Sequence, residues 1–154
     1  MTSYLHLCQH GAMTTTGEPD YAALLAFRTA LRRFHRWSEQ KAEEAGLTAA
    51  QHQLLLAVKG HDNPSGPTIG EVAQYLLLRH HSTVELVNRA QAAGLVDRVK
   101  DGTDGRVVRV RLTATGERAI AELTQLHIDE LQQLEPLLRH LVGDERMDDA
   151  LPLR

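Results

Sequence analysis

The sequence predicts a mainly helical fold (α+β) with one β-hairpin, on three observations. Residues 95–116 alternate apolar and polar side chains around a turn rich in aspartate and glycine, as hairpins do. Upstream, three segments begin with the residue pattern of a helix N-terminus. Long apolar stripes at helical spacing flank this middle region. The predicted fold is therefore a winged helix-turn-helix whose long N- and C-terminal helices form a dimerisation domain.

The first long helix is expected to start at Asp20 and to end at Gly46. Its apolar residues recur at three- and four-residue intervals, at Leu24, Phe27, Leu31 and Phe34, with Trp37 beside them. A long helix with one apolar stripe and no globular core of its own is most economically buried against a second copy of the chain. We therefore expect this helix to contribute to a dimer interface.

The three short helices are predicted from capping boxes, in which a hydroxyl and a carboxylate or amide three residues later bond to each other's backbone amides. The boxes are Thr48–Gln51, Thr68–Glu71 and Ser82–Glu85. Gly60 and the turn-forming residues 63–67 separate the first two helices. Three helices in this order, followed by a hairpin, indicate a DNA-binding unit.

The last of these helices is expected to read DNA, and its spacing assigns its faces. The inward residues are predicted to be Thr83, Leu86, Val87 and Ala90. His81, Glu85 and Asn88 then lie opposite, with Ser82 and Arg89 at the flanks. Asparagine can pair with adenine and glutamate with cytosine, while Ser82 and Arg89 can hold phosphates. The alternative is a solvated helix face with no partner.

The hairpin has an apolar and a largely cationic face, because Val108, Val110 and Leu112 alternate with Val107, Arg109 and Arg111. Asp101 to Gly105 forms the predicted turn, which projects Arg106 near the tip. Arg106 is expected to enter a minor groove, with Arg109 as a second candidate contact. The alternative is a solvated arginine. One of Arg98, Arg109 and Arg111 is expected to pair with Asp97 or Asp101, and Asp104 to brace the turn.

The second long helix follows Thr113. Its stripe consists of Ile120, Leu123, His127, Leu131, Leu134, Leu138 and Leu141. Pro136 removes a backbone donor, so we expect a kink or a break just before it. The predicted division is dimerisation helices at 19–46 and 114–143, a DNA-binding domain at 47–113, and tails at 1–18 and 144–154. The dimerisation residues are predicted to include Leu24, Phe27, Leu31, Leu131, Leu134, Leu138 and Leu141.

Taken in their order along the chain, these motifs resemble those of the bacterial multiple-antibiotic-resistance (MarR) regulators, and the resemblance covers residues 20–143. The resemblance rests on Leu47-Thr48-x-x-Gln51, Ile69-Gly-Glu-Val-Ala73, Leu86-Val-Asn-Arg89, Gly94-Leu-Val-x-Arg98, Asp104-Gly-Arg106 and Leu112-Thr-x-x-Gly116. One departure is Thr103, where the family commonly has a further wing arginine. The resemblance implies a homodimeric repressor of a pseudo-palindromic operator. It also implies release by a small, often aromatic or phenolic effector bound between the dimerisation and DNA-binding regions.

The charge distribution agrees with a DNA surface in the middle of the chain. The net charge is −3, but residues 79–111 hold seven basic and four acidic groups, a local +3. Residues 112–154 hold four basic and nine acidic groups, a local −5. A distant acidic end does not cancel a basic face once the separation exceeds a Debye length of about 8 Å.

Other classes of protein find little support. The 154 residues suit one domain, and no apolar run of about 18 residues or secretory signal is present, so the cytoplasm is expected. No nucleophile elbow, phosphate-binding loop or carboxylate pair indicates an enzyme or a cofactor. The nine histidines lack metal-ligand spacing, although a zinc site between subunits stays open. Cys8 is either incidental or an oxidant sensor. A winged helix that binds a protein partner without DNA is the remaining alternative.

Overall fold

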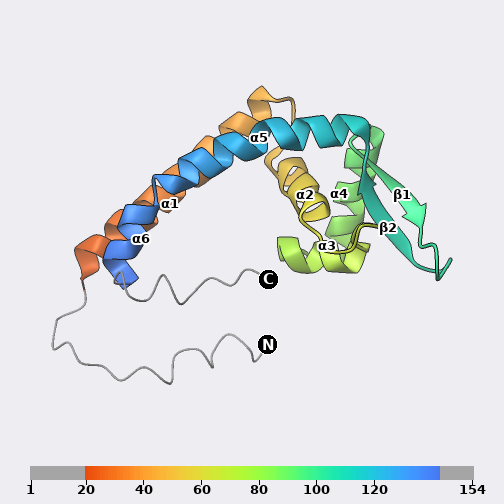
Figure 1. Ribbon diagram of the computed structural model, residues 1–154, viewed down its shortest axis with the longest axis horizontal. Helices are drawn as coiled ribbons and strands as arrows, with labels where there is room; N and C mark the ends of the chain where they lie inside the picture. The colour runs from red at the N-terminus through yellow and green to blue at the C-terminus, as the bar shows by residue number, and fades with distance from the viewer. Residues whose placement is uncertain (1–19, 143–154) are drawn as a thin grey trace, which may run out of the picture.

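The computed structural model describes residues 20–142, which form a long helical arm joined to a winged module (Figure 1). The predicted tails and Cys8 lie outside the described residues. The elements are α1 (Tyr21–Glu44), α2 (Ala49–Lys59), α3 (Ile69–Leu76), α4 (His80–Ala92), β1 (Val96–Lys100), β2 (Val108–Leu112), α5 (Ala114–Gln132) and α6 (Glu135–Val142). The predicted fold class, mainly helical with one hairpin, is confirmed. Within the described range, no helix is both long and apolar enough to cross a membrane.

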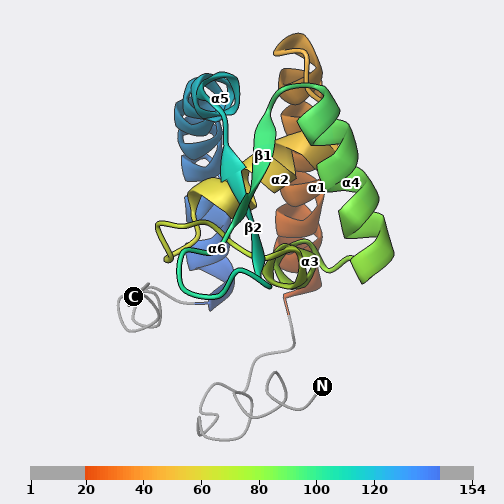
Figure 2. The same ribbon diagram turned by 90° about the vertical axis from the view of Figure 1, so that its right-hand side faces the viewer.

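The arm consists of α1 packed against α5 and α6, and it extends away from the module that contains α2, α3, α4 and the hairpin (Figures 1 and 2). The predicted start and end of α1 are confirmed. The Asp20 side chain accepts a hydrogen bond of 2.8 Å from the Ala23 backbone N–H and so caps α1. Gly46, at a φ of +76°, ends the helix in the left-handed conformation that favours glycine.

Two of the three predicted capping boxes form, and the third prediction is wrong. Both bonds of the box are present at Thr48–Gln51 and at Thr68–Glu71. In contrast, α4 begins at His80, so Ser82 and Glu85 lie inside the helix. Two residues, Leu78 and Arg79, separate α4 from the left-handed C-cap of α3 at Leu77, and the extended backbone of Arg79 already starts the next helix. A sequence motif alone does not locate the first turn.

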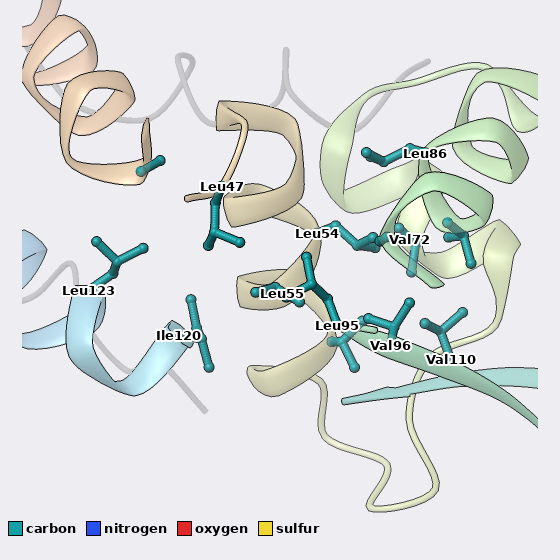
Figure 3. Close-up of a cluster of buried hydrophobic side chains, with 14 residues drawn as sticks. Leu47, Leu54, Leu55, Val72, Leu86, Leu95, Val96, Val110, Ile120 and Leu123 are labelled. Atoms are coloured by element: carbon teal, nitrogen blue, oxygen red, sulfur yellow. The ribbon is translucent and has the colours of Figure 1, made fainter. Parts of the chain in front are cut away.

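The core lies within the winged module and includes the start of α5 (Figure 3). Its largest fully buried side chains include Leu54, Leu55, Val72, Val87, Val96, Val110 and Ile120. Ile120 and Leu123 were expected on the dimerisation stripe, but both are at most 3% exposed within the single chain. Residues on both sides of the predicted boundary at 113 and 114 thus share one core, and the domain division stays a prediction.

The remaining residues predicted for dimerisation lie along the arm. Leu24 is 48% exposed and Leu131 is 44% exposed. The half-buried members are Phe27, Leu31, Leu134, Leu138 and Leu141. The break predicted at Pro136 is confirmed, because α5 ends at Gln132 and α6 begins at Glu135. The arm therefore continues past the break with a set of apolar side chains that the single chain does not cover.

Two close backbone approaches fix the hairpin against its neighbours. The β2 backbone N–H of Val110 donates to the Pro67 carbonyl at 2.8 Å, and Val110 is fully buried. At the other end, Thr113 caps α5 by accepting from the Gly116 backbone N–H at 3.1 Å. Gly116 itself lies against the Leu95 carbonyl, which an added Cβ would meet at 2.1 Å. The motif Leu112-Thr-x-x-Gly116 is thus a cap combined with a close contact between α5 and the start of β1.

Candidate nucleic-acid interface

The start of α4, the short helix α3 and the tip of the hairpin lie at the same end of the winged module, away from α5 (Figures 1 and 2). The face prediction for α4 is confirmed, since its inward residues Thr83, Leu86, Val87 and Ala90 are each at most 2% exposed. On the outward side the structure exposes His81, Glu85, Asn88 and Arg89 and half-buries Ser82. A continuous polar face of one helix is therefore presented beside the hairpin.

The hairpin turn is held by the Asp101 carboxylate. Its Oδ1 accepts hydrogen bonds from the Thr103 hydroxyl at 2.5 Å, the Thr103 N–H at 2.8 Å and the Asp104 N–H at 3.1 Å. These bonds and the Arg109 guanidinium hold the pKa of Asp101 well below its usual value, the Thr103 hydroxyl contributing most. A carboxylate that stays ionised keeps the turn in one conformation across the physiological pH range.

Arg106 is exposed at the tip, as predicted. Its backbone N–H donates to the Asp104 carboxylate at 3.0 Å, which confirms that Asp104 braces the turn. The structure shows no hydrogen bond from the Arg106 guanidinium to another residue of the described range. The five donors of this group are therefore available to an external acceptor.

The structure gives Arg109 bonding partners within the protein, and its contact with DNA stays a prediction. Its guanidinium bonds to the Asp101 carboxylate and donates to the Gly66 carbonyl at 2.9 Å, and its side chain is only 15% exposed. Arg109 was also expected as one candidate to pair with an aspartate of the hairpin, and that pairing is confirmed. The alternation of the strand places Arg109 on a polar face, and there its side chain is bonded to the loop before α3 at Gly66. Arg109 thus braces the wing.

Sequence reasoning missed a cluster between β1 and α4. The Arg98 guanidinium donates to the Asn88 amide oxygen at 2.7 Å and to the Gln91 amide oxygen at 2.6 Å. Arg98 was expected only as one candidate to pair with Asp97 or Asp101, and no local pattern connects it with Asn88, which lies ten residues earlier. The contact arises only when β1 folds back beside α4 (Figure 2).

A buried histidine and a half-buried one lie together where the arm meets the winged module. The rings of His52 on α2 and His127 on α5 are 4.5 Å apart between centroids. His127 donates from Nδ1 to the Leu123 carbonyl at 2.8 Å, and its Nε2 shares a hydrogen bond of 2.7 Å with the Ser38 hydroxyl. His52 is only 3% exposed, and its Nδ1 has no hydrogen-bond partner among residues 20–142.

We expect the free energy of unfolding to decrease as the pH is lowered from 7.5 to 5, because His52 is buried in its neutral form. Burial, and secondarily the nearby His127, lower the pKa of His52 from 6.5 to about 4. The unfolded chain therefore binds a proton below pH 6.5 while the folded state stays neutral, and the stability present above that pH is lost as the pH falls towards 4. The loss at pH 5 is about 2 kcal/mol. Urea unfolding at both pH values measures it. His52→Leu should flatten the dependence, whereas His35→Gln on the exposed side of α1 should not; an unchanged slope in His52→Leu would contradict the assignment.

Within residues 20–142, no group of three or more histidine, cysteine or acidic side chains is arranged to hold a metal ion. Exposed cations lie on and beside α4 and at the hairpin tip. They include Arg79, Arg89 and Arg106.

Comparisons with known proteins agree with this arrangement. Residues 45–107 match the model of the MarR family. An uncharacterised HTH-type transcriptional regulator of Bacillus subtilis, YsmB, is 46% identical over 56 residues, a match that covers 36% of this chain and 38% of that protein. The transcriptional activatory protein BadR of Rhodopseudomonas palustris is 27% identical over 130 residues, covering 75% of this chain and 74% of BadR.

Solved structures share the fold. The MepR–DNA complex of S. aureus aligns with a TM-score of 0.63 at 23% identity, covering 85% of this chain and 91% of that one. AbsC, a MarR family regulator of Streptomyces coelicolor, aligns with a TM-score of 0.65 at 17% identity, covering 90% and 94%. The family match runs from the loop after α1 through α2, α3, α4, β1 and the hairpin turn, and the fold of the solved structures extends over β2 and the arm as well. Residues 45–107 are therefore similar to the MarR family, and the described part of the chain has the fold of solved MarR family regulators.

Proposed function

We propose that this regulator binds double-stranded DNA, with α4 in the major groove and the hairpin as a wing in the adjacent minor groove. The observation that carries the proposal is the position of the exposed polar face of α4 and of Arg106 at the same end of the module. MepR, which has the same fold, has been solved with DNA. A helix fits the major groove, and a single arginine fits the narrow minor groove.

The outward residues of α4 divide by chemistry. His81, Glu85 and Asn88 are proposed to meet base edges, and Ser82 and Arg89 to hold phosphates. Because α4 begins at His80, Glu85 lies inside the helix, where its carboxylate is exposed and takes no part in a cap. Glu85 is therefore available to accept from a cytosine amino group.

The second part of the proposal is that the protein acts as a homodimer through the arm. Leu24 and Leu131 leave apolar area in contact with solvent, and half-buried leucines continue the surface along α5 and α6. Exposed apolar patches of this kind mark interaction surfaces. A symmetric pair of chains presents two α4 helices to half-sites about 34 Å apart, which implies a pseudo-palindromic operator.

We propose that the dimer represses transcription, since occupying an operator excludes polymerase without further contacts. BadR is named as an activatory protein, so a promoter–reporter assay with and without the regulator has to decide the sign. A small aromatic or phenolic effector is proposed to release the DNA. A groove of about 270 Å³ between α2 and α3 has the apolar character for such a molecule, although it lies within the winged module and not between this module and the arm. It is lined by Gln53, Leu56, Ala57, Gly60, Tyr75 and Leu76.

Selection of bound sites from a random DNA pool tests the proposal. We expect a pseudo-palindromic consensus, and fluorescence anisotropy on it should show affinity that falls steeply with salt. If no sequence is enriched and no binding occurs even at low salt, DNA binding is wrong and a winged module that binds a protein partner becomes the better hypothesis.

Arg106→Ala should weaken operator binding severalfold or more without loss of folding. The exposed guanidinium is the group proposed to enter the minor groove, so the preference for A·T pairs flanking the half-sites should also disappear. Anisotropy on two operators, with A·T or G·C flanks, measures both effects.

Arg118→Ala, on α5 on the other side of the module, is the matched control and should bind as the wild type does. Thr103→Arg, which restores the second arginine of the family pattern, should tighten binding and steepen the salt dependence by about one phosphate contact. If Arg106→Ala bound both operators as tightly as the wild type at physiological salt, the hairpin would not be a DNA-contacting wing.

A further inference from the structure

We propose that Arg98 is a positioning residue for base recognition, which fixes the side chain of Asn88 on α4 instead of contacting DNA. This inference rests on the proposed function. It assigns a specificity role to a residue of the wing that faces the reading helix rather than the nucleic acid.

The position of Arg98 follows from the pleat of β1. Arg98 lies two residues after the fully buried Val96, so both side chains project from the same face of the hairpin. That face packs on α4 (Figure 2). Arg98 therefore extends along α4 towards its outward side and reaches Asn88 and Gln91 there.

The chemistry of the contact fixes which end of each amide faces Arg98. A guanidinium carries only donors, so it must meet the oxygen of an amide, never its nitrogen. The bonds of 2.7 Å to Asn88 Oδ1 and 2.6 Å to Gln91 Oε1 satisfy this rule, and a third donor of Arg98 points to the Val84 carbonyl at 3.5 Å. The Asn88 Nδ2 donors are then left for an acceptor outside the protein.

Fixing the amide matters because an unconstrained asparagine can present either its oxygen or its nitrogen to a base edge. A free side chain must also lose rotamer entropy when it binds. With Arg98 bonded to Asn88, the Asn88 amide already has its orientation and has already lost its rotamer entropy before the protein binds DNA. The bonds also occupy several donors of Arg98 within the protein, which argues against a second role as a phosphate contact.

Base preference, measured by anisotropy on the selected operator and on single-base variants of each half-site, tests the inference. Arg98→Met removes the guanidinium, and Arg98→Lys keeps the charge but cannot bond to both amides. Asn88→Ala removes the side chain proposed to contact the base. Asn88→Asp keeps a partner for Arg98 but has no amide donors. Arg111→Met is the matched control, because it removes one charge from the same hairpin and Arg111 has no hydrogen bond to another described side chain.

We expect Arg98→Met, Arg98→Lys, Asn88→Ala and Asn88→Asp each to reduce discrimination about tenfold at one shared base position per half-site. The double variant Arg98→Met/Asn88→Ala should lose no more than either single variant, because the two residues act as one unit. The salt slope should stay unchanged in Arg98→Lys and Arg98→Met, and discrimination should stay unchanged in Arg111→Met. Thermal unfolding of each variant controls for folding.

An equal loss on all sequences, with a shallower salt slope in Arg98→Met and recovery in Arg98→Lys, would make Arg98 a phosphate contact and overturn the inference. Additive losses in the double variant would overturn it as well. These outcomes differ from failure of the proposed function, in which the wild type itself selects no operator.

Discussion

Replacing both Leu131 and Leu134 by glutamate is expected to make the protein monomeric and to abolish operator binding. Leu131 is 44% exposed and Leu134 is half-buried, both on the part of the arm beyond the shared core. A buried leucine contributes about 1.5–3 kcal/mol, and a dimer contains each position twice. Glutamates there would also be desolvated without partners. We therefore expect the dimer dissociation constant to rise by about four orders of magnitude or more.

Sedimentation at micromolar concentration and anisotropy on the full operator measure the two losses. Leu56→Glu is the matched control, because Leu56 is 45% exposed but lies on α2 outside the arm. It should leave the dimer intact. A wild type that sediments as a monomer, or a monomeric variant that binds the full operator with unchanged affinity, would contradict the proposed role of the arm.

Gly116→Ala is expected to destabilise the fold by about 3 kcal/mol or more. The added Cβ would lie 2.1 Å from the Leu95 carbonyl oxygen, and the obstacle is backbone rather than a flexible side chain. Either α5 or the start of β1 must then shift, which disturbs the cap that Thr113 provides and the packing of Ile120.

Gly70→Ala provides a control with the opposite sign. Gly70 also lies in the first turn of a helix, but its Cβ would meet only the Thr68 hydroxyl oxygen, at 3.8 Å. Alanine has the higher helix propensity, so Gly70→Ala should stabilise the protein by up to about 1 kcal/mol. Urea unfolding of both variants measures the difference, and equal midpoints for the two would refute the close contact at Gly116.

The prediction of local structure succeeded where the interacting groups lie within a few residues of one another. The boxes at Thr48 and Thr68 each need only the next three residues, and the end of α1 needs only the φ that Gly46 permits. The third box failed because Ser82 and Glu85 satisfy the same local rule inside a helix that had already begun at His80. Where a helix starts depends on the preceding turn, and here that turn uses a left-handed leucine, Leu77, which no pattern indicates.

The candidate site shows the same division. Periodicity was enough to place Asn88 outward on α4 and Arg106 at the hairpin tip, because both follow from the repeat of one element. Periodicity could not show that Arg106 is free to bind DNA while Arg109 is already bonded within the protein. Only the packing of the hairpin against the loop at Gly66 shows that the Arg109 guanidinium is already hydrogen-bonded. Nor could periodicity connect Arg98 with Asn88.

By itself the sequence determined the order of the elements, their faces, the resemblance of residues 45–107 to the MarR family and the basic middle region, because these depend on spacing and residue type along the chain. Only the tertiary structure decided which arginines are free to bind an external group and which are already hydrogen-bonded within the protein. It also decided which side chains form hydrogen bonds with one another, and that α5 begins in the core of the module before it joins the arm. The physical reason is that a hydrogen bond or a buried contact depends on distance in space, and residues far apart in the chain acquire that distance only when the elements pack.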